Sequence, residues 1–470
     1  MKISLFDHVF FKVEEVGMAP LPMGGAMILD PKTAPWKLTA QEVADHLAAR
    51  MEKIPLMRQK PVQDKLNIGS IQLVDDPEFD VKKHLTVSQL KKPGGYKELA
   101  EHLGKFSQTP IPTDRPLWQF EVIEGLRGGK IAVATHIHHG ILDGAGAMES
   151  LASLNDLSPI APETPRQKKW ASDTEPSPSK LIGTALLENL NRLYVMTPKL
   201  IGKTAGPLLR AGSDKVLSRL SGKDRKKALS ATAEVTVHAT SLNATGLSME
   251  RRVAWKTLKL SRIKQLGKRH ECTVNDIALL LCSTAMDEYY TTNTEEVDTD
   301  QVAVMPFNVR TEADGASGNS VTIRSINLHT TQSNVIDRLK AIAADTRIIK
   351  QEVRPETKGP IDGKELMAVF SPFLLESALR LVSRFDIMGR IKMGNTMISN
   401  VPGAPVPLYV AGAAVETVIP MAPVVEGMAL SCTIASTHEK LVIGFHSCAE
   451  NLGNMDALLS GVDNGYKALS

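Results

Sequence analysis

The sequence predicts an α/β protein of two domains, each a β-sheet layered with helices. Short apolar runs that indicate strands alternate with longer amphipathic segments on both sides of a proline-rich stretch. That stretch, residues 158–180, contains five prolines and is typical of an exposed linker. The chain has 470 residues, more than the roughly 250–300 that usually share one core. We therefore expect a first domain at 1–157, a connector at 158–230 and a second domain at 231–470.

The individual elements follow from these patterns. Thr39 and Glu42 have the spacing of a capping box and predict the start of a helix that runs to residue 51. Before the linker we expect a further helix at 97–103 and strands at 25–29, 118–124 and 130–135. After it we expect strands near 254–260, 301–307, 396–399, 428–435 and 441–447, with helices at 274–289, 334–351 and 366–384.

Composition narrows the class of protein. The net charge of +3 is too small to indicate nucleic-acid binding, and we expect none. Four cysteines without paired spacing indicate reduced thiols and a cytoplasmic protein. The first residues lack the apolar run of a secretory signal. No uncharged apolar run reaches the roughly 18 residues that a membrane-spanning helix needs.

The most informative residues are 138–144, where two adjacent histidines are followed by three spacers and then by Asp143 and Gly144. They follow the apolar run 130–135, so they lie where a strand ends and a glycine-rich turn begins. Such a place can hold a catalytic imidazole rigidly, and a neutral imidazole can take a proton from a hydroxyl near pH 7. Because strand residues alternate, only one of the two histidines can face a given cavity.

Two alternatives compete with catalysis by this motif. The histidines could be hydrogen-bonded members of a core, or they could bind zinc. Two adjacent histidines and Asp143 make a poor chelating set, and no Cys-x-x-Cys motif supplements them, so we expect no metal site. Asp143 would instead brace the turn through an ion pair or orient an imidazole.

Residues 138–144 resemble the His-His-x-x-x-Asp-Gly motif of the CoA-dependent acyltransferase superfamily, which includes chloramphenicol acetyltransferase and the condensation domains of peptide synthetases. Other segments resemble bacterial wax ester synthase/diacylglycerol acyltransferases, in that family's order along nearly the whole chain. They are the opening segments 5–11 and 23–31, the Pro-Leu-Trp motif in 114–118, the Asn-Asp motif in 273–276, the pair 305–310 and 318–319, and the Asn-Val-Pro motif in 399–403. The chain departs from the family at 242–252, where a Gly-Pro-Arg-Arg run is replaced.

The resemblance implies two chloramphenicol-acetyltransferase-like domains, each a mixed β-sheet flanked by helices, with a substrate tunnel between them. Acyl-CoA and the acceptor would enter from opposite sides and meet at His139, the expected general base, with His138 beside it. The acceptor would be a long-chain alcohol, which yields a wax ester, or diacylglycerol, which yields triacylglycerol. Acyl-CoA is then a substrate, and no cofactor is expected. The expected tunnel residues are Gly144, Pro116, Leu117, Trp118 and Asn400.

Several motif residues also have a structural alternative. Asn275 could shape the tunnel or donate its amide to the developing oxyanion, whereas residues 273–276 also fit an ordinary helix cap. Arg310 could be a surface residue, but the resemblance implies a structural ion pair with Asp143. Trp118 could be a core aromatic rather than a tunnel residue.

The connector carries most of the basic charge. Residues 180–227 contain eleven Lys or Arg and three acids, a net charge of +8, together with apolar residues at helical spacing. A basic amphipathic segment such as 181–227 is typical of contact with a membrane surface or lipid droplet, and equally of a connector helix packed on both domains. We expect a cytoplasmic protein peripherally associated with the inner membrane or with lipid droplets.

Two other classes of function stay open. One is a condensation-type acyltransferase that acts on carrier-protein thioesters, against which the free-standing length and the Asn-Asp and Asn-Val-Pro motifs argue. The other is a non-catalytic lipid-binding protein, against which the intact motif at 138–144 argues. The sequence therefore favours transfer of a fatty acyl group from acyl-CoA to a hydroxyl.

Overall fold

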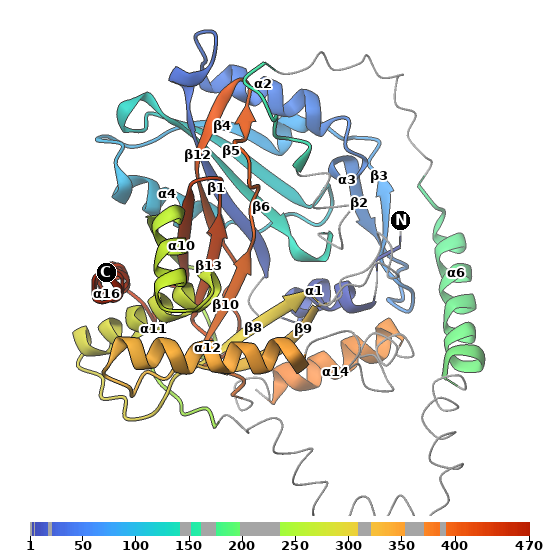
Figure 1. Cartoon of the computed structure of the whole chain (residues 1–470). Helices are drawn as coiled ribbons and strands as arrows, with labels where there is room; N and C mark the ends of the chain where they lie inside the picture. Colours follow the sequence, from blue (N-terminus) through green and yellow to red (C-terminus); the bar gives the residue numbers. More distant parts are fainter. Residues whose placement is uncertain are drawn as a thin grey trace, which may run out of the picture.

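Two six-stranded sheets with helices packed on them dominate the molecule (Figure 1). The computed structural model describes residues 2–3, 5–16, 21–141, 152–160, 175–197, 236–308, 321–352, 371–385 and 392–470. Each sheet contains both parallel and antiparallel strand pairs. The expected mixed α/β fold is therefore confirmed.

The first sheet carries the histidine motif on one of its central strands. Its strand order is β11-β12-β1-β6-β5-β4. The strands are β1 (Pro22–Asp30), β4 (Leu85–Gln89), β5 (Trp118–Glu124), β6 (Ile131–His138), β11 (Tyr409–Val410) and β12 (Ala413–Met421). Helix α2 (Ala40–Met51) covers one face through Val43 and Leu47, which are fully buried. This packing leaves the opposite face of the sheet for contact with the second half.

The other elements of the first half surround this sheet. Helix α1 (Leu5–Glu15) packs on the turn after β6, and α4 (Tyr96–Ser107) packs on the second sheet. Helix α3 (Pro55–Arg58) leads into a two-stranded sheet of β2 (Gln59–Val62) and β3 (Gln72–Asp75). Helix α6 (Pro178–Asn191) lies at the outer side of this region (Figure 1).

The second sheet has the strand order β7-β14-β13-β10-β8-β9. Its strands are β7 (Arg251–Lys259), β8 (Val302–Asn308), β9 (Val321–Asn327), β10 (Thr396–Val401), β13 (Leu430–Ser436) and β14 (Lys440–Cys448). The helices of this half are α10 (Leu260–Arg269), α11 (Val274–Thr292), α12 (Val335–Glu352), α14 (Pro372–Arg384) and α16 (Asp456–Leu469).

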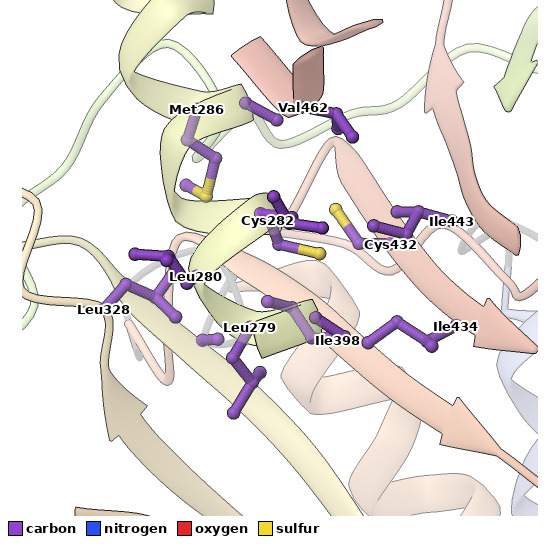
Figure 2. Close-up of a cluster of buried hydrophobic side chains, with 14 of the residues drawn as sticks. Leu279, Leu280, Cys282, Met286, Leu328, Ile398, Cys432, Ile434, Ile443 and Val462 are labelled. Atoms are coloured by element: carbon purple, nitrogen blue, oxygen red, sulfur yellow. The ribbon is translucent and has the colours of Figure 1, made fainter. Parts of the chain in front are cut away.

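The core of the second half lies between α11 and this sheet (Figure 2). Residues 276–286 of α11 are all buried, because α10, α12 and α16 contact the helix as well as the strands beneath it. In Figure 2, Cys282 of α11 and Cys432 of β13 lie side by side in this core. All four cysteines of the chain are free.

A strand from the second half completes the first sheet. Strand β12 follows β10 in the chain but pairs with β1 of the first half, from Gly24 opposite Met421 to Asp30 opposite Ala414. Between the two sheets, Ala26 and Ala134 meet Trp255 in a separate apolar cluster. The sequence patterns do not indicate this strand at 413–421, and its pairing with β1 joins the two halves. The boundaries at 157 and 231 stay a prediction.

Most expected elements lie close to their expected positions. Helix α2 begins after Thr39, whose side chain forms the expected capping box with Glu42. Strand β6 runs three residues further than expected, to His138. The helix expected at 366–384 is present as α14, which Ser371 caps, whereas residues 353–370 lie outside the described residues. The sequence patterns do not indicate helices α1, α10 and α16 or strands β4 and β9.

A substitution of Gly24 tests how closely β1 packs against β6. A Cβ added at Gly24 would lie 2.6 Å from the backbone oxygen of Thr135 on β6, which cannot move away as a flexible side chain could. Gly24→Val should therefore destabilise the protein by about 1–3 kcal/mol, measured by urea unfolding. Gly453→Ala is the matched control, because a Cβ there meets nothing within 4 Å. Equal unfolding midpoints for the two variants would contradict this packing.

Candidate active site

Strand β6 carries the two histidines to the start of a turn. The strand ends at His138, and His139–Ile141 form a 3-10 turn. The backbone amide of His138 donates to the carbonyl oxygen of Leu117 at 3.0 Å, so the Pro-Leu-Trp motif fixes the end of β6. Gly140 allows α1 to pack on the turn, because a Cβ there would lie 2.3 Å from the Phe11 ring.

Both ring nitrogens of His138 face protein groups. Its Nδ1 accepts a hydrogen bond from the Gly140 backbone amide at 3.0 Å, and its Nε2 lies 3.5 Å from Oε1 of Glu14. The ring packs on Phe11 with 4.2 Å between ring centroids. Burial, with smaller contributions from neighbouring histidines, lowers the pKa of His138 to about 3. His138 is therefore a neutral, anchored imidazole at neutral pH.

His139 has a different environment. Its ring stacks on Phe10 of α1, with 3.9 Å between centroids and 22° between the planes. The residue is half-buried, and its Nδ1 has no hydrogen-bond partner among the described residues. Burial lowers the pKa of His139 to about 4, although the residue's own backbone carbonyl opposes the shift. A neutral imidazole with a nitrogen that is free of hydrogen bonds can accept a proton.

Glu14 lies next to this pair of histidines. It lines a cavity with His138, Phe11 and Thr113. Burial raises the pKa of Glu14 to about 7, although a hydrogen bond from the Leu21 backbone amide opposes the shift. The sequence contained no signal for this contact, because Glu14 lies on α1, more than a hundred residues before His138.

The structure brings together two further residues of the predicted site. The Asn400 side chain, on β10, donates from Nδ2 to Oδ1 of Asn275 at the start of α11, at 2.8 Å. Thr273 caps α11 and forms a capping box with Asp276, so the capping alternative holds for these two residues. Asn275 itself is free of the cap, and its amide nitrogen can donate elsewhere.

The Pro-Leu-Trp motif is part of the first core. Trp118 is fully buried, and its indole nitrogen donates to the carbonyl oxygen of Met57 at 2.8 Å. Its ring stacks on His84 at 4.7 Å between centroids. Pro116 and Leu117 are also buried. None of these three residues lines a cavity described here, so their contacts favour the core alternative for Trp118.

The remaining predicted residues lie outside the described residues. They are Asp143, Gly144 and Arg310. The ion pair between Asp143 and Arg310 therefore stays a prediction. Within the part of the chain that the structure describes, no group of three or more His, Cys, Asp or Glu side chains could hold a metal ion.

Two buried histidines near the motif escaped the sequence analysis. His136 lies two residues before His138 on β6, so the strand's period of two could have placed it on the same face. His446 lies on β14 of the second sheet, and both histidines line one cavity with Ser107. Nothing in the sequence links residues that lie so far apart.

Two family models match the chain. The wax ester synthase/diacylglycerol acyltransferase catalytic domain matches residues 3–278, and the C-terminal domain of the same family matches residues 317–470. The chain belongs to the wax ester synthase/diacylglycerol acyltransferase family. The protein is thus an acyltransferase, which acts with an acyl donor and an acceptor.

The matches to relatives and to solved structures cover nearly the full length of the chain. This acyltransferase is 28% identical over 471 residues to a putative diacylglycerol O-acyltransferase of Mycobacterium tuberculosis, covering 99% of each chain. It is 26% identical over 463 residues to the O-acyltransferase WSD of Acinetobacter baylyi, covering 97% of this chain and 94% of the other. Its fold resembles that of a wax ester synthase/diacylglycerol acyltransferase from Marinobacter aquaeolei, with a TM-score of 0.69, 22% identity and coverage of 100% and 98%. The starter condensation domain of rhizomide synthetase matches with a TM-score of 0.54, 13% identity and coverage of 99% and 92%.

The buried histidines make the acyltransferase sensitive to acid. Burial lowers the pKa of His136, His139 and His446 to about 4 and that of His138 to about 3, from 6.5. Below pH 6.5 the unfolded chain therefore binds protons that the native protein does not. The free energy of unfolding should fall as the pH drops from about 6.5 toward 4.

Melting temperatures between pH 4.5 and 7.5 test this. His136→Phe removes one of the four groups and should make the decrease shallower, whereas a substitution of the exposed His438 by Gln should not. A melting temperature that is constant across this range would contradict the burial of neutral histidines.

Proposed function

We propose that this acyltransferase moves a fatty acyl group from acyl-CoA to the hydroxyl of a long-chain alcohol or of diacylglycerol, with His139 as the general base. The observation that carries the proposal is the contrast between the two histidines of the motif. Nδ1 of His138 accepts a hydrogen bond from Gly140 and its Nε2 lies beside Glu14 without a hydrogen bond, whereas Nδ1 of His139 forms no hydrogen bond with another described residue. The names of the relatives, which include diacylglycerol O-acyltransferases, support the acceptor class.

The reaction is a direct transfer. His139 takes the proton of the acceptor hydroxyl while the hydroxyl oxygen attacks the thioester carbonyl carbon. The tetrahedral intermediate then collapses, the carbon–sulfur bond breaks, and the imidazolium returns the proton to the CoA thiolate. Acyl-CoA is a substrate, and the scheme needs neither a cofactor nor an acyl-enzyme.

General base catalysis supplies only part of the rate. A positioned base contributes about 10²–10⁴-fold. Alignment of thioester and hydroxyl and stabilisation of the oxyanion must supply the rest. The Asn275 amide is our candidate for shaping the oxyanion region, because its oxygen is occupied by Asn400 and its nitrogen can donate. We assign Asp143 and Arg310 the structural ion pair that holds the loop after His139.

Because the proposed substrates are lipids, the enzyme would meet them at a membrane or lipid-droplet surface. No helix among the described residues is both long and apolar enough to cross a membrane. Helix α6 packs on the first half through Leu181 and Ala185, and Asn189 donates to the carbonyl oxygen of Ile68 at 2.9 Å. Leu186, Leu187 and Leu190 of this helix are each at least half exposed, as are Leu193 and Tyr194 in the turn Arg192–Met196 that follows it. We therefore propose peripheral contact of segment 181–227 with the cytoplasmic membrane or lipid droplets.

An acceptor panel with palmitoyl-CoA tests the reaction itself, through CoA release and identification of the ester. His139→Ala should lower kcat by about 10²–10⁴-fold with each accepted substrate, because it removes the base. His138→Ala should leave a measurable fraction of activity. A larger loss for His138→Ala than for His139→Ala would reverse the assignment. Absence of CoA release with every acceptor would refute the proposed function.

Vesicle flotation tests the membrane contact. Each basic residue near an anionic surface contributes about 1 kcal/mol, so binding should weaken as salt increases. Charge reversal to Glu at Lys223, Arg225, Lys226 and Lys227 should release the protein from anionic vesicles and spare activity on short, soluble alcohols. The matched control reverses four exposed lysines elsewhere, Lys32, Lys82, Lys83 and Lys268. Equal flotation of both variants would leave segment 181–227 as a connector only.

A further inference from the structure

Helix α1 presents a carboxyl group to the first histidine of the motif. Phe11 and Glu14 are three residues apart on α1, so their side chains lie on the same side of the helix. The Phe11 ring packs on the His138 ring, and Oε1 of Glu14 lies 3.5 Å from Nε2 of His138. The acyl transfer as proposed does not use Glu14, so this contact needs an explanation of its own.

The hydrogen bond from Gly140 determines which nitrogen of His138 carries the hydrogen. The backbone amide of Gly140 donates to Nδ1 at 3.0 Å, so Nδ1 has no hydrogen of its own. Burial lowers the pKa of His138 to about 3, so the ring is neutral near pH 7. A neutral imidazole carries one ring N–H, which must then be at Nε2. His138 therefore directs an N–H donor toward Glu14.

Glu14 supplies an acceptor within reach of this donor. Nε2 of His138 is buried and forms no hydrogen bond with a described residue, and a buried donor without an acceptor is costly. The Leu21 backbone amide donates to Glu14 and holds its carboxyl group in place. Burial raises the pKa of Glu14 to about 7, but a carboxyl group keeps an oxygen that accepts in either protonation state. A small rotation of Glu14 would thus complete a hydrogen bond from Nε2.

The other nitrogen of His138 connects this contact to the proposed base. Gly140, which donates to Nδ1, is the central residue of the 3-10 turn His139–Ile141. If the ring hydrogen moved from Nε2 to Nδ1, the ring N–H and the Gly140 amide would face each other, and the turn would have to move. A displacement of about 1 Å at a reacting group can cost about 10²-fold in rate.

We propose that Glu14 is a positioning residue, which keeps the hydrogen of His138 on Nε2 and thereby holds the turn that carries His139. The inference rests on the proposed function. Adjacent residues of a strand point to opposite sides, so Glu14 acts through the backbone of the turn and does not contact the reacting groups. Loss of such a role lowers kcat and leaves substrate binding nearly unchanged.

Substitutions of similar length at Glu14 test this role, with CoA release from palmitoyl-CoA as the measurement. Glu14→Met removes the acceptor and should lower kcat by about tenfold or more, while KM changes by less than about twofold. Glu14→Gln keeps an amide oxygen that accepts from Nε2 and should retain most of the activity. Glu14→Leu repeats the test if the Met variant does not fold, and melting temperatures confirm that each variant is folded.

The ¹⁵N chemical shifts of the imidazole report the tautomer, because the N–H nitrogen and the bare nitrogen resonate apart. In protein with ¹⁵N-labelled histidine, the His138 signals are those missing from His138→Asn. They should show the Nε2–H tautomer in the wild type and in Glu14→Gln. In Glu14→Met, part of the population should carry the hydrogen on Nδ1. An unchanged Nε2–H tautomer in Glu14→Met would overturn the proposal.

Thr113→Val is the matched control. Thr113 lines the same cavity as Glu14 and His138, so this variant removes a hydroxyl group from the cavity and leaves the acceptor. Its kcat should equal that of the wild type. An unchanged kcat in Glu14→Met, a rise in KM alone, or an equal loss in the Met and Gln variants would overturn the positioning role. Absence of CoA release by the wild type would instead refute the proposed function.

Discussion

The pairing of β12 with β1 is the constraint on which the candidate site depends. Strand β12 belongs to the second half by sequence and to the first sheet by hydrogen bonding. It also packs closely on the second sheet, where a Cβ at Gly444 would lie 2.3 Å from the carbonyl oxygen of Pro420. One strand thus holds both sheets together. Because β6 and β14 belong to different sheets, this contact allows His136 and His446 to line one cavity.

Burial determines the protonation state of the histidines at the candidate site. Helix α1 packs on the turn after β6, and its Phe10 and Phe11 contact the rings of His139 and His138. Removal from water disfavours the charged imidazole, so these histidines are neutral near pH 7. In the proposed mechanism, a base with such a low pKa is weak. Close alignment of hydroxyl and thioester must therefore carry much of the rate.

The sequence by itself determined the family and the local structure around the motif. The apolar run at 130–135 predicted the strand that leads to the histidines, because strand propensity and turn-forming glycines are local properties, although the strand runs on to His138. The capping box at Thr39 and the cap at Thr273 follow from the same short-range hydrogen bonding. The order of motifs along the chain predicted the acyltransferase family, which the family models confirm.

Only the tertiary structure decided which side chains meet. Asn275 and Asn400 lie 125 residues apart in the chain and share a hydrogen bond. Glu14 faces His138, and Ser107 faces His446, although neither pair has a pattern that links its members. Trp118 is a core residue because its contacts with Met57 and His84 depend on how β5 packs. Local sequence preferences contain no information on such distant contacts, because the packing of the sheets and helices creates them.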